Sequence, residues 1–517
     1  MTWPRIAAAR SSCRSARTAI GRRYRVRRRA STTLLGLQLT RRDLLVSGAG
    51  VVTALPAVRA AFRLLDASGA QAATGDTVQQ FVSRPDLKPP AIEVLQAARG
   101  AAPGLVFLAP SSGPGQRGAM IVDDAGELVW FHPVSNKAVT DFKVARFHGR
   151  PVLTWWEGKS ADGLGDGDWV VVDASYRELA RFSTARGLHG DLHEFVLTPQ
   201  NTALVTSNEV RTWDLTSVRG SRRGRVVGGV VQELALPSGR LLWEWHSLDH
   251  VPVAETEIRA RPGPRFDYFH INSIDIAPDG NLIVSARNTW AAYKLHRRTG
   301  GIIWRLGGKR SDFVLGPGAR FEWQHDVREH AHGLVSVFDN AAAPQEEPES
   351  RALLLALDTR RKRASLVHAY VHRPEPVLSH FLGNTQLLPN GDVFVGWGGS
   401  PYVTEFTRSG AIAFHARLPR GGQTYRAFRF PWVGRPAGRP ALAERDGALF
   451  ASWNGATAVA AWQVLEGDSA TGLRRNQTFP RTGFETKLTL TAPARNAAVV
   501  ALDAAGAPLG TSPTLHL

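Results

Sequence analysis

The stretch INSIDIAPDGNLIVSAR, residues 271–287, decides the fold of this chain. Apolar residues flank a tight polar turn at Pro278–Gly280, and this pattern predicts two antiparallel strands joined in a hairpin. The same hairpin recurs in HEFVLTPQNTALVTS (193–207), HDVREHAHGLVSVFD (325–339) and NTQLLPNGDVFVGWG (384–398), with a looser copy at 142–157. Such repetition indicates a fold built from copies of one unit.

A second kind of hairpin alternates with the first. It has an apolar strand, a polar turn and a second strand that closes on an aromatic or apolar residue, and it occurs at residues 119–132, 169–182, 230–245, 291–306, 353–370 and 403–416. Two hairpins make a four-stranded sheet, which leaves both faces exposed unless the sheets stack in a ring. Six copies therefore predict an all-β, six-bladed β-propeller, in which Trp130, Trp243 and Trp304 wedge between blades.

After residue 430 the pattern changes. The segment FPWVGRPAGRPALAERDG (430–447) is rich in Pro, Gly and Arg, and the residues that follow it alternate like short antiparallel strands. They predict a small C-terminal β-sandwich similar to fibronectin type III modules. We therefore expect three parts: a basic leader at residues 1–75, the propeller at 76–435 and the sandwich at 436–517.

The positive charge of the chain is concentrated in the leader. The formal net charge is +18, but residues 1–42 hold twelve of the 63 basic residues and no acidic one, which leaves 51 basic against 45 acidic residues elsewhere. A nucleic-acid-binding function is therefore disfavoured. Cys13, the only cysteine, also lies in the leader, so we expect neither a disulfide nor thiolate chemistry in the rest of the protein.

An export signal is predicted in LTRRDLLVSGAGVVTALPAVRAA, residues 39–61. Arg41 and Arg42 precede a mildly apolar stretch, Leu44–Val58, which is shorter than the roughly 20 apolar residues that span a bilayer. This arrangement resembles a twin-arginine signal, which carries folded proteins across a membrane. We expect a periplasmic, cell-surface or extracellular protein with no stable membrane insertion after export, and the alternative is an ordinary basic tail.

Polar residues recur at the start of the first strand of each hairpin. Those that lie five or six residues before their turns are His193, Asn272, His325 and Asn384. In a propeller this strand lines the central channel, so these side chains are expected to converge. His270 precedes Asn272 by two residues and shares its strand face, and Arg287 ends the same hairpin at the same edge of the sheet.

Other uses of these residues stay open at this point. Three histidines can bind zinc, but no HxH or HExxH spacing joins them and the cationic Arg287 would repel a dication, so no metal site is assigned. The polar residues could also serve only to satisfy water in the channel. His330 and His332 fall in a turn and are expected to face solvent, and DGLGDGDWV (162–170) is interpreted as a turn leading into a strand rather than a calcium loop.

Several motifs together resemble those of the bacterial-type aryl sulfotransferases that use no activated nucleotide sulfate donor. They are HEFVLTPQNTAL, FHINSIDIAPDGNLIVSARNTWAAYKL, FEWQHDV, VSVFDN and GNTQLLPNGDVFVGWG, and the resemblance covers residues 77–430. It implies a six-bladed propeller that moves a sulfuryl group from an aryl sulfate to a phenol through a sulfated histidine, with no cofactor. Characterised members tend to carry a disulfide and an N-terminal sandwich, whereas this chain has no cysteine after Cys13 and its predicted sandwich is C-terminal.

The resemblance also implies roles for individual residues. His325, in QHD, matches the nucleophile, and Arg287, in SAR, matches a clamp on the sulfuryl oxygens. Residues that match substrate contacts are His270 and Asn272, in HINS, and Thr385, which stands beside Asn384. His193 matches a further channel histidine.

These residue types suit sulfuryl transfer. A nucleophile that approaches a sulfur ringed by anionic oxygens should be uncharged, and neutral imidazole meets that need. A nearby Arg287 would lower the pKa of His325 and favour the neutral form. A second histidine, His270 or His193, can protonate the departing phenolate and deprotonate the incoming phenol. Two other function classes stay open: a non-catalytic propeller that binds a ligand or a cell-surface partner, and a metal-dependent hydrolase or lyase that uses the same histidines.

Overall fold

A meander of four antiparallel strands is the repeating unit of the fold. The computed structural model describes residues 77–261, 263–490 and 494–517, and residues 75–517 form one compact unit. The predicted leader, with Arg41, Arg42 and Cys13, lies outside the described residues. Within the described ranges, no helix is long and apolar enough to cross a membrane.

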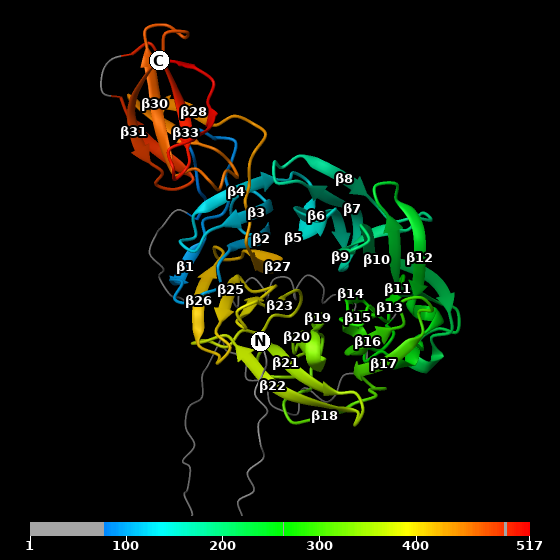
Figure 1. Ribbon diagram of the computed structural model, residues 1–517. Coiled ribbons are helices and arrows are strands. Elements are labelled where there is room, and N and C mark those ends of the chain that lie inside the picture. The colour runs from blue at the N-terminus through cyan, green and yellow to red at the C-terminus, as the bar shows by residue number, and fades with distance from the viewer. Residues whose placement is uncertain (1–76, 262, 491–493) are drawn as a thin grey trace, which may run out of the picture. The chain divides into compact units, whose positions relative to one another are not determined.

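The meanders follow one another around a ring (Figure 1). In chain order the strands are β2 (Leu105–Ser112), β3 (Gly118–Val122) and β4 (Leu128–Pro133); β5 (Ala138–Phe147), β6 (Arg150–Ala161), β7 (Leu164–Val172) and β8 (Glu178–Phe182); β9 (His189–Leu197), β10 (Thr202–Trp213), β11 (Gly224–Ala235) and β12 (Arg240–His246); β14 (Ile271–Ile276), β15 (Leu282–Ala286), β16 (Ala291–Leu295) and β17 (Ile302–Gly307); β19 (His325–Glu329), β20 (Leu334–Asp339), β21 (Arg351–Asp358) and β22 (Arg363–Val371); β23 (Asn384–Leu387), β24 (Val393–Gly396), β25 (Tyr402–Phe406), β26 (Ile412–Arg417) and finally β27 (Gln423–Phe430). The predicted all-β class is confirmed. The first kind of predicted hairpin joins the two inner strands of a meander, and the second kind joins the two outer strands.

Three short strands add to the meanders: β1 (Glu93–Gln96), β13 (Phe266–Asp267) and β18 (Val314–Leu315). The connections between strands contain the 3-10 turns η1 (Thr216–Val218), η2 (Ser247–Asp249), η3 (Val253–Glu255), η4 (Arg287–Thr289) and η5 (Ala331–Gly333). A single bridge between Gly167 of β7 and Gly190 of β9 joins the second and third meanders into one nine-stranded sheet.

The last strand of the ring completes the first meander. Strand β27 pairs antiparallel with β2, with Leu105 opposite Phe430, so the sheet order is β27-β2-β3-β4. These hydrogen bonds join the two ends of the repeat region and leave no open edge at the junction.

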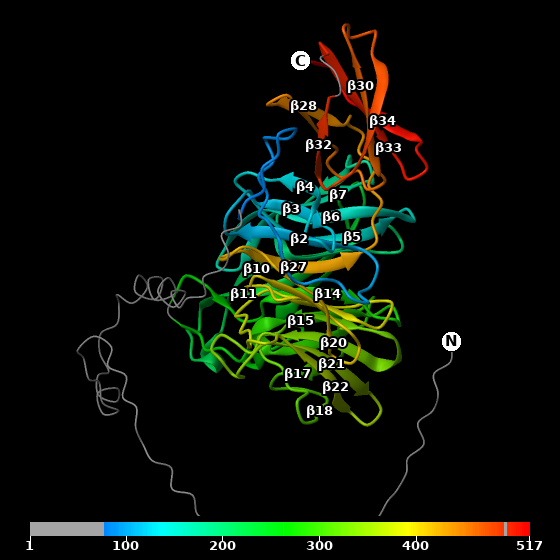
Figure 2. The ribbon, with the colours of Figure 1, turned by 90° about the vertical axis from the view of Figure 1, so that its left-hand side faces the viewer.

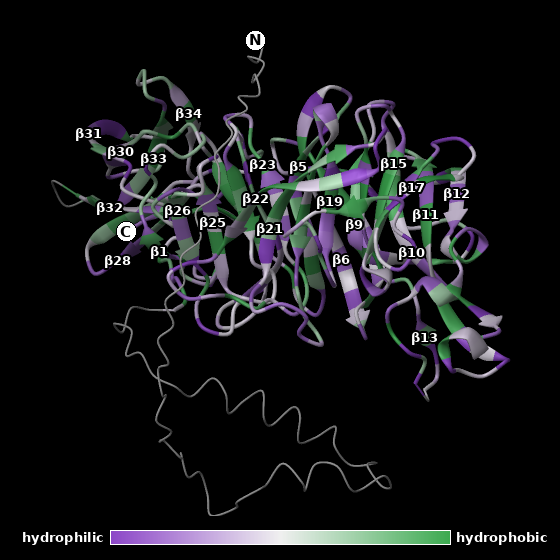
Figure 3. Ribbon diagram, turned by 90° about the horizontal axis from the view of Figure 1, so that it is seen from below, coloured by the Kyte–Doolittle hydropathy of each residue, from purple (hydrophilic) through white to green (hydrophobic). Residues whose placement is uncertain are grey.

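The apolar core lies between neighbouring meanders rather than at one centre. In the side view their strands are stacked in layers (Figure 2), and apolar residues are concentrated in the strands (Figure 3). Trp130 of β4 packs on Phe142 of β5 with ring centroids 5.7 Å apart, and Trp304 of β17 packs against Val337 of the next meander. The predicted wedge role is confirmed for these two tryptophans, while Trp243 is only partly buried.

Two further sheets follow the ring. One contains β28 (Ala441–Arg445), β29 (Ala448–Ser452) and β32 (Glu485–Thr489), and the other contains β30 (Ala461–Gly467), β31 (Arg474–Pro480), β33 (Asn496–Leu502), β34 (Pro508–Thr511) and β35 (Leu515–His516). Leu449 and Leu488 from the first sheet share one apolar cluster with Val464 and Val499 from the second. The two sheets therefore enclose a common core, as the layers of a β-sandwich do.

Candidate active site

The predicted site residues lie on the innermost strands of four consecutive meanders. His193 belongs to β9, Asn272 to β14 and His325 opens β19, while Asn384 and Thr385 open β23. All five side chains are buried, with exposed fractions of 3% or less. Figure 1 places these strands around the centre of the ring, so the fold gathers residues that are distant in the sequence.

His270 and Arg287 join the cluster through the β14–β15 hairpin. The backbone N–H of Arg287 donates to the carbonyl oxygen of His270 at 3.0 Å, because the end of β15 returns beside the start of β14. The ring of His270 meets that of His193 edge-on, with centroids 5.0 Å apart. Arg287, His193 and His270 lie close enough to His325 for electrostatic interaction with them to lower its pKa. The structure therefore brings together the three histidines and the arginine that the sequence singled out.

The hydrogen bonds of His325 fix which ring nitrogen carries the proton. Asn340 Nδ2 donates hydrogen bonds to the carbonyl oxygens of Ser379 (2.8 Å) and Leu382 (2.9 Å), so Asn340 Oδ1 faces the imidazole. That Oδ1 lies 2.7 Å from His325 Nδ1 and accepts its hydrogen, because an amide oxygen cannot donate. The other nitrogen, Nε2, accepts from the backbone N–H of Leu382 at 3.4 Å. Nε2 therefore carries the lone pair.

His325 is held in its neutral form. Burial lowers the pKa of His325 well below its ordinary value, and the cationic Arg287 lowers it further, against the opposing effect of the hydrogen bond to Asn340. A neutral imidazole whose Nε2 lone pair accepts only the long hydrogen bond from Leu382 can exchange it for an electrophile and attack.

The two other histidines are each oriented by a carboxylate. His193 Nδ1 lies 2.5 Å from Asp191 Oδ2, and His270 Nδ1 lies 2.6 Å from Asp267 Oδ2. Burial opposes the ionisation of Asp191, yet the neighbouring His193 brings the pKa of that carboxyl below its ordinary value. A carboxylate on Nδ1 keeps the hydrogen there and leaves Nε2 to exchange a proton with a bound group.

Arg287 supplies a cation that forms no ion pair with the described carboxylates. Its guanidinium lies over the ring of Trp323 at 4.6 Å and donates to Asn288 Oδ1 at 3.1 Å and to the carbonyl oxygen of His380 at 3.4 Å. Burial lowers the pKa of Arg287 to about 10, so it stays charged at neutral pH. Among the described residues, no acidic side chain lies within ion-pair distance of it. Such a cation suits an anionic ligand.

Asn272 and Thr385 each carry a buried polar atom that has no hydrogen-bond partner among the described residues. Asn272 donates through Nδ2 to the carbonyl oxygen of Gln324 at 2.6 Å, which leaves its Oδ1 unpaired, and Thr385 Oγ1 is unpaired as well. Buried polar atoms are rarely left unsatisfied, so a bound group that reaches them is an explanation. The oxygen of Asn272 can accept a hydrogen bond, and the hydroxyl of Thr385 can donate one.

Asn384 is used differently. Its Nδ2 donates to the carbonyl oxygen of Ala427 at 2.8 Å, and its Oδ1 accepts from the N–H of the same residue at 2.9 Å. Both ends of the amide are therefore engaged with β27. Asn384 therefore joins β23 to β27, the last strand of the ring. The neighbouring Thr385 is the residue whose hydroxyl can still form a hydrogen bond with a bound group.

A network of buried charges lies beside the histidines on the same inner strands. Arg426 of β27 contacts Asp141 Oδ1 at 2.8 Å and Glu194 Oε2 at 3.0 Å, and it donates to the carbonyl oxygen of Asn272 at 2.9 Å. Glu194 also pairs with Arg328 Nη2 at 2.5 Å. Burial raises the pKa of Asp141 to about 6, whereas its three cationic neighbours lower that of Glu194. The network fixes the inner strands relative to one another.

The β6–β7 hairpin lies against this cluster. Its two-residue turn, Asp162 and Gly163, has positive φ values of 54° and 77°, as an Asp-Gly hairpin turn requires. The interpretation of DGLGDGDWV as a turn into a strand is confirmed. A Cβ on Gly163 would stand 3.0 Å from His270 Cε1, and the N–H of Gly165 donates to Asp191 Oδ1 at 2.9 Å. The hairpin thus supports both carboxylate-oriented histidines.

Several residues of the site escaped the sequence analysis. They are Asp191, Asp267, Trp323, Asn340, Tyr425 and Arg426. An acidic residue two or three positions before a histidine was a usable signal for Asp191 and Asp267, because so short a separation lets the carboxylate reach the imidazole. His332 lies exposed in the β19–β20 turn as predicted, whereas His330 is partly buried and contacts Ser336 Oγ at 2.9 Å.

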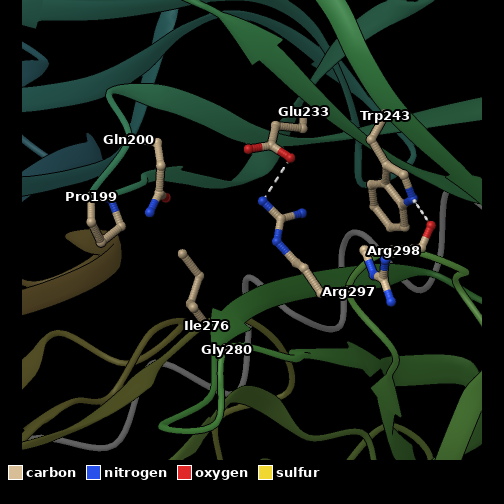
Figure 4. Close-up of a pocket in the computed structure, with 8 residues that line it drawn as sticks. All are labelled: Pro199, Gln200, Glu233, Trp243, Ile276, Gly280, Arg297 and Arg298. Carbon is tan, nitrogen blue, oxygen red and sulfur yellow. Dashed lines mark hydrogen bonds and ion pairs between the residues drawn. The ribbon is translucent and has the colours of Figure 1, made fainter.

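A pocket of about 600 Å³ lies between the third and fourth meanders, at the turn ends of their inner strands (Figure 4). Several polar groups that line the pocket are paired with one another. Arg297 forms an ion pair with Glu233 at 2.6 Å, and Trp243 Nε1 donates a hydrogen bond to the backbone carbonyl oxygen of Arg298 at 3.2 Å. None of the predicted site residues lines it. In the described part of the chain, no group of three His, Cys, Asp or Glu side chains is placed to hold a metal ion.

Solved structures with similar folds share little sequence with this chain. A protein of unknown function from Bacteroides caccae is 14% identical, with 63% of this chain and 98% of that one covered and a TM-score of 0.40. A catalytically inactive virginiamycin B lyase from Staphylococcus aureus is 7% identical, with 70% and 97% covered and a TM-score of 0.34. Regucalcin from Agrobacterium tumefaciens is 11% identical, with 59% and 79% covered and a TM-score of 0.30.

The sequence itself matches a known family. No curated protein matches the chain at a significant level. The family model described as arylsulfotransferase (ASST) matches residues 143–418, which is more than half of the chain and contains every predicted site residue. The matched region runs from the first strand of the second meander to the end of β26. This chain belongs to the arylsulfotransferase (ASST) family.

Proposed function

We propose that the protein transfers a sulfuryl group from an aryl sulfate to a phenol, with His325 as the nucleophile. The observation that carries this proposal is the geometry of His325: its proton is fixed on Nδ1 by Asn340, its Nε2 carries the lone pair and accepts only one long hydrogen bond, 3.4 Å from the N–H of Leu382, and burial keeps the ring neutral. Membership of the arylsulfotransferase family supports the substrate class.

The first half-reaction forms a sulfohistidine. Nε2 of His325 attacks the sulfur, an N–S bond forms and the S–O bond to the aryl group breaks. The departing phenolate takes a proton from His270 or His193, whose Nδ1 atoms are held by carboxylates. Arg287 binds the sulfuryl oxygens and stabilises their charge as the bonds change. Asn340 accepts a hydrogen bond from the ring that has become cationic.

The second half-reaction reverses these steps with another phenol. The incoming hydroxyl gives its proton to the histidine that released one, the phenolate oxygen attacks sulfur, and the N–S bond breaks to restore neutral His325. A covalent intermediate of this kind gives ping-pong kinetics. Every proton and electron pair is balanced within the two substrates and the side chains, so the proposal needs no cofactor.

The proposal is tested by trapping the intermediate. The protein is incubated with 4-nitrophenyl sulfate and no acceptor, then digested under mildly alkaline conditions and analysed by peptide mass spectrometry. We expect one equivalent of nitrophenol to be released rapidly and a sulfated peptide that contains His325. Release without modification of the protein would favour direct hydrolysis, which is the metal-dependent alternative, and elemental analysis of the same sample would decide it. An inert protein would favour a non-catalytic binding propeller.

We also propose that the protein acts outside the cytoplasm, because Arg41 and Arg42 precede a short apolar stretch typical of twin-arginine signals. Replacing both arginines by lysine keeps the charge but removes the paired guanidinium groups. We expect the variant to accumulate in the cytoplasmic fraction as a folded, active protein, with the unmodified chain in the exported fraction. Equal export of both forms would contradict the signal.

A further inference from the structure

A second pocket, about 680 Å³ in volume, lies between the first and second meanders. We call it the rim pocket. It is formed by the β2–β3 loop, the β4–β5 connection and the end of β6, and its lining residues are Gln116, Arg117, Pro133, Val134, Ser135, Asn136, Lys137, Ala138, Gly158, Lys159 and Ser160.

The rim pocket is lined by cations and by no acidic side chain. Arg117, Lys137 and Lys159 contribute the charges. Lys137 is paired with Glu157 at 3.1 Å, but Arg117 and Lys159 are exposed and have no carboxylate within ion-pair distance among the described residues. Two unpaired cations beside the hydroxyls of Ser135 and Ser160 attract an anion and can donate hydrogen bonds to it.

The β6–β7 hairpin connects the rim pocket to the candidate active site. Lys159 and Ser160 lie on the hairpin, and Ser160 is opposite Gly165, whose N–H holds the carboxylate that orients His193. Three residues beyond Ser160, Gly163 lies against His270. The chain turns back at Asp162 and Gly163, so Ser160 and Gly163 are separated by at most about 10 Å, and the rim pocket and His270 lie against the same end of this hairpin.

We propose that the rim pocket binds an anionic group carried by the acceptor, so that the preferred acceptor is a phenol joined through a spacer to a carboxylate or a similar anion. This inference rests on the proposed transfer reaction and adds a substrate class to it. The phenolic hydroxyl lies at the histidines while the anion lies between Arg117 and Lys159.

The test compares matched acceptors and matched variants. The acceptors are 4-hydroxyphenyl alkanoates of increasing chain length and their neutral primary amides, each assayed with 4-nitrophenyl sulfate as donor. The test variant is Arg117→Gln with Lys159→Gln. The control is Arg360→Gln with Arg363→Gln, two exposed arginines at the far turn of the fifth meander, which changes the net charge equally.

We expect the unmodified protein to prefer the acid over the amide, with an optimum at an intermediate chain length. The test variant should lose about five- to tenfold in kcat/KM for the acids, as expected for two exposed ionic contacts, and almost nothing for the amides. The control should match the unmodified protein, and added salt should reduce the preference. An unchanged acid-to-amide ratio in the test variant, or an equal loss in the control, would overturn the inference.

A binding measurement separates this inference from the proposed function. Calorimetry with phenylalkanoates, which carry the anion but no hydroxyl to sulfate, reports the rim pocket without any turnover. If no phenol is sulfated, the proposed function fails while calorimetry still decides the anion site. If phenols are sulfated but calorimetry shows no binding that depends on Arg117 and Lys159, only the anion site fails.

Discussion

His325→Ala is expected to lower kcat/KM for transfer from 4-nitrophenyl sulfate by at least about a thousandfold, because removing a covalent nucleophile leaves only binding and charge stabilisation. The substitution also leaves Asn340 Oδ1 and the N–H of Leu382 without their partner. A stability loss of about 1–3 kcal/mol is expected from those unpaired groups, so thermal unfolding is measured beside the kinetics.

His332→Ala provides the matched control. It removes the same side chain from the same hairpin, but at the exposed β19–β20 turn. Full activity of this variant, together with a folded but inactive His325→Ala protein that forms no sulfated peptide, would support the nucleophile. Substantial transfer by His325→Ala would refute it, and His193 or His270 would then be tested in the same assay.

Arg287→Met is expected to have the second largest effect. Methionine keeps the contact with Trp323 but removes the charge that faces the anionic sulfuryl group. Losing one such stabilising group costs about 3 kcal/mol, so kcat/KM should fall about a hundredfold or more, with most of the loss in kcat.

The pH profile of Arg287→Met gives an independent readout. Arg287 lowers the pKa of His325, so its removal raises that pKa. The nucleophile is then protonated at a higher pH than in the unmodified protein, and the acid limb of kcat/KM moves to higher pH. Arg320→Met is the control, because Arg320 also stacks on an indole, that of Trp290 at 5.9 Å, but is exposed. An unshifted acid limb would show that Arg287 does not act on His325.

Much of the repeat region was predictable because its signals are local. Each hairpin needs only a tight turn and flanking alternation, and the turns at Pro199, Pro278 and Pro389 fall where expected between β9 and β10, β14 and β15, and β23 and β24. Alignment of the hairpins by their turns predicts which polar residues lie on the inner strands. It identifies His193, Asn272 and His325. The same alignment placed Asn384 on an inner strand, but it did not reveal that the amide of Asn384 pairs with the backbone of Ala427.

The contacts that set the chemistry depend on pairs that no local pattern reveals. Asn340 reaches His325 across a hairpin and is itself oriented by the carbonyl oxygens of Ser379 and Leu382. Arg426 follows no motif, yet it pairs with Asp141 and Glu194 from two other meanders. The partners of these side chains come from segments that are distant in the sequence and meet only in the folded ring, so their roles can be recognised only from the structure.

The pairing of β27 with β2 has a consequence for biosynthesis. A nascent chain that has not yet released residues 423–430 from the ribosome lacks both the strand that fastens the two ends of the repeat region and the guanidinium of Arg426. The candidate active site therefore cannot be completed while the repeats are still being translated, and it forms only after residues 423–430 have left the ribosome.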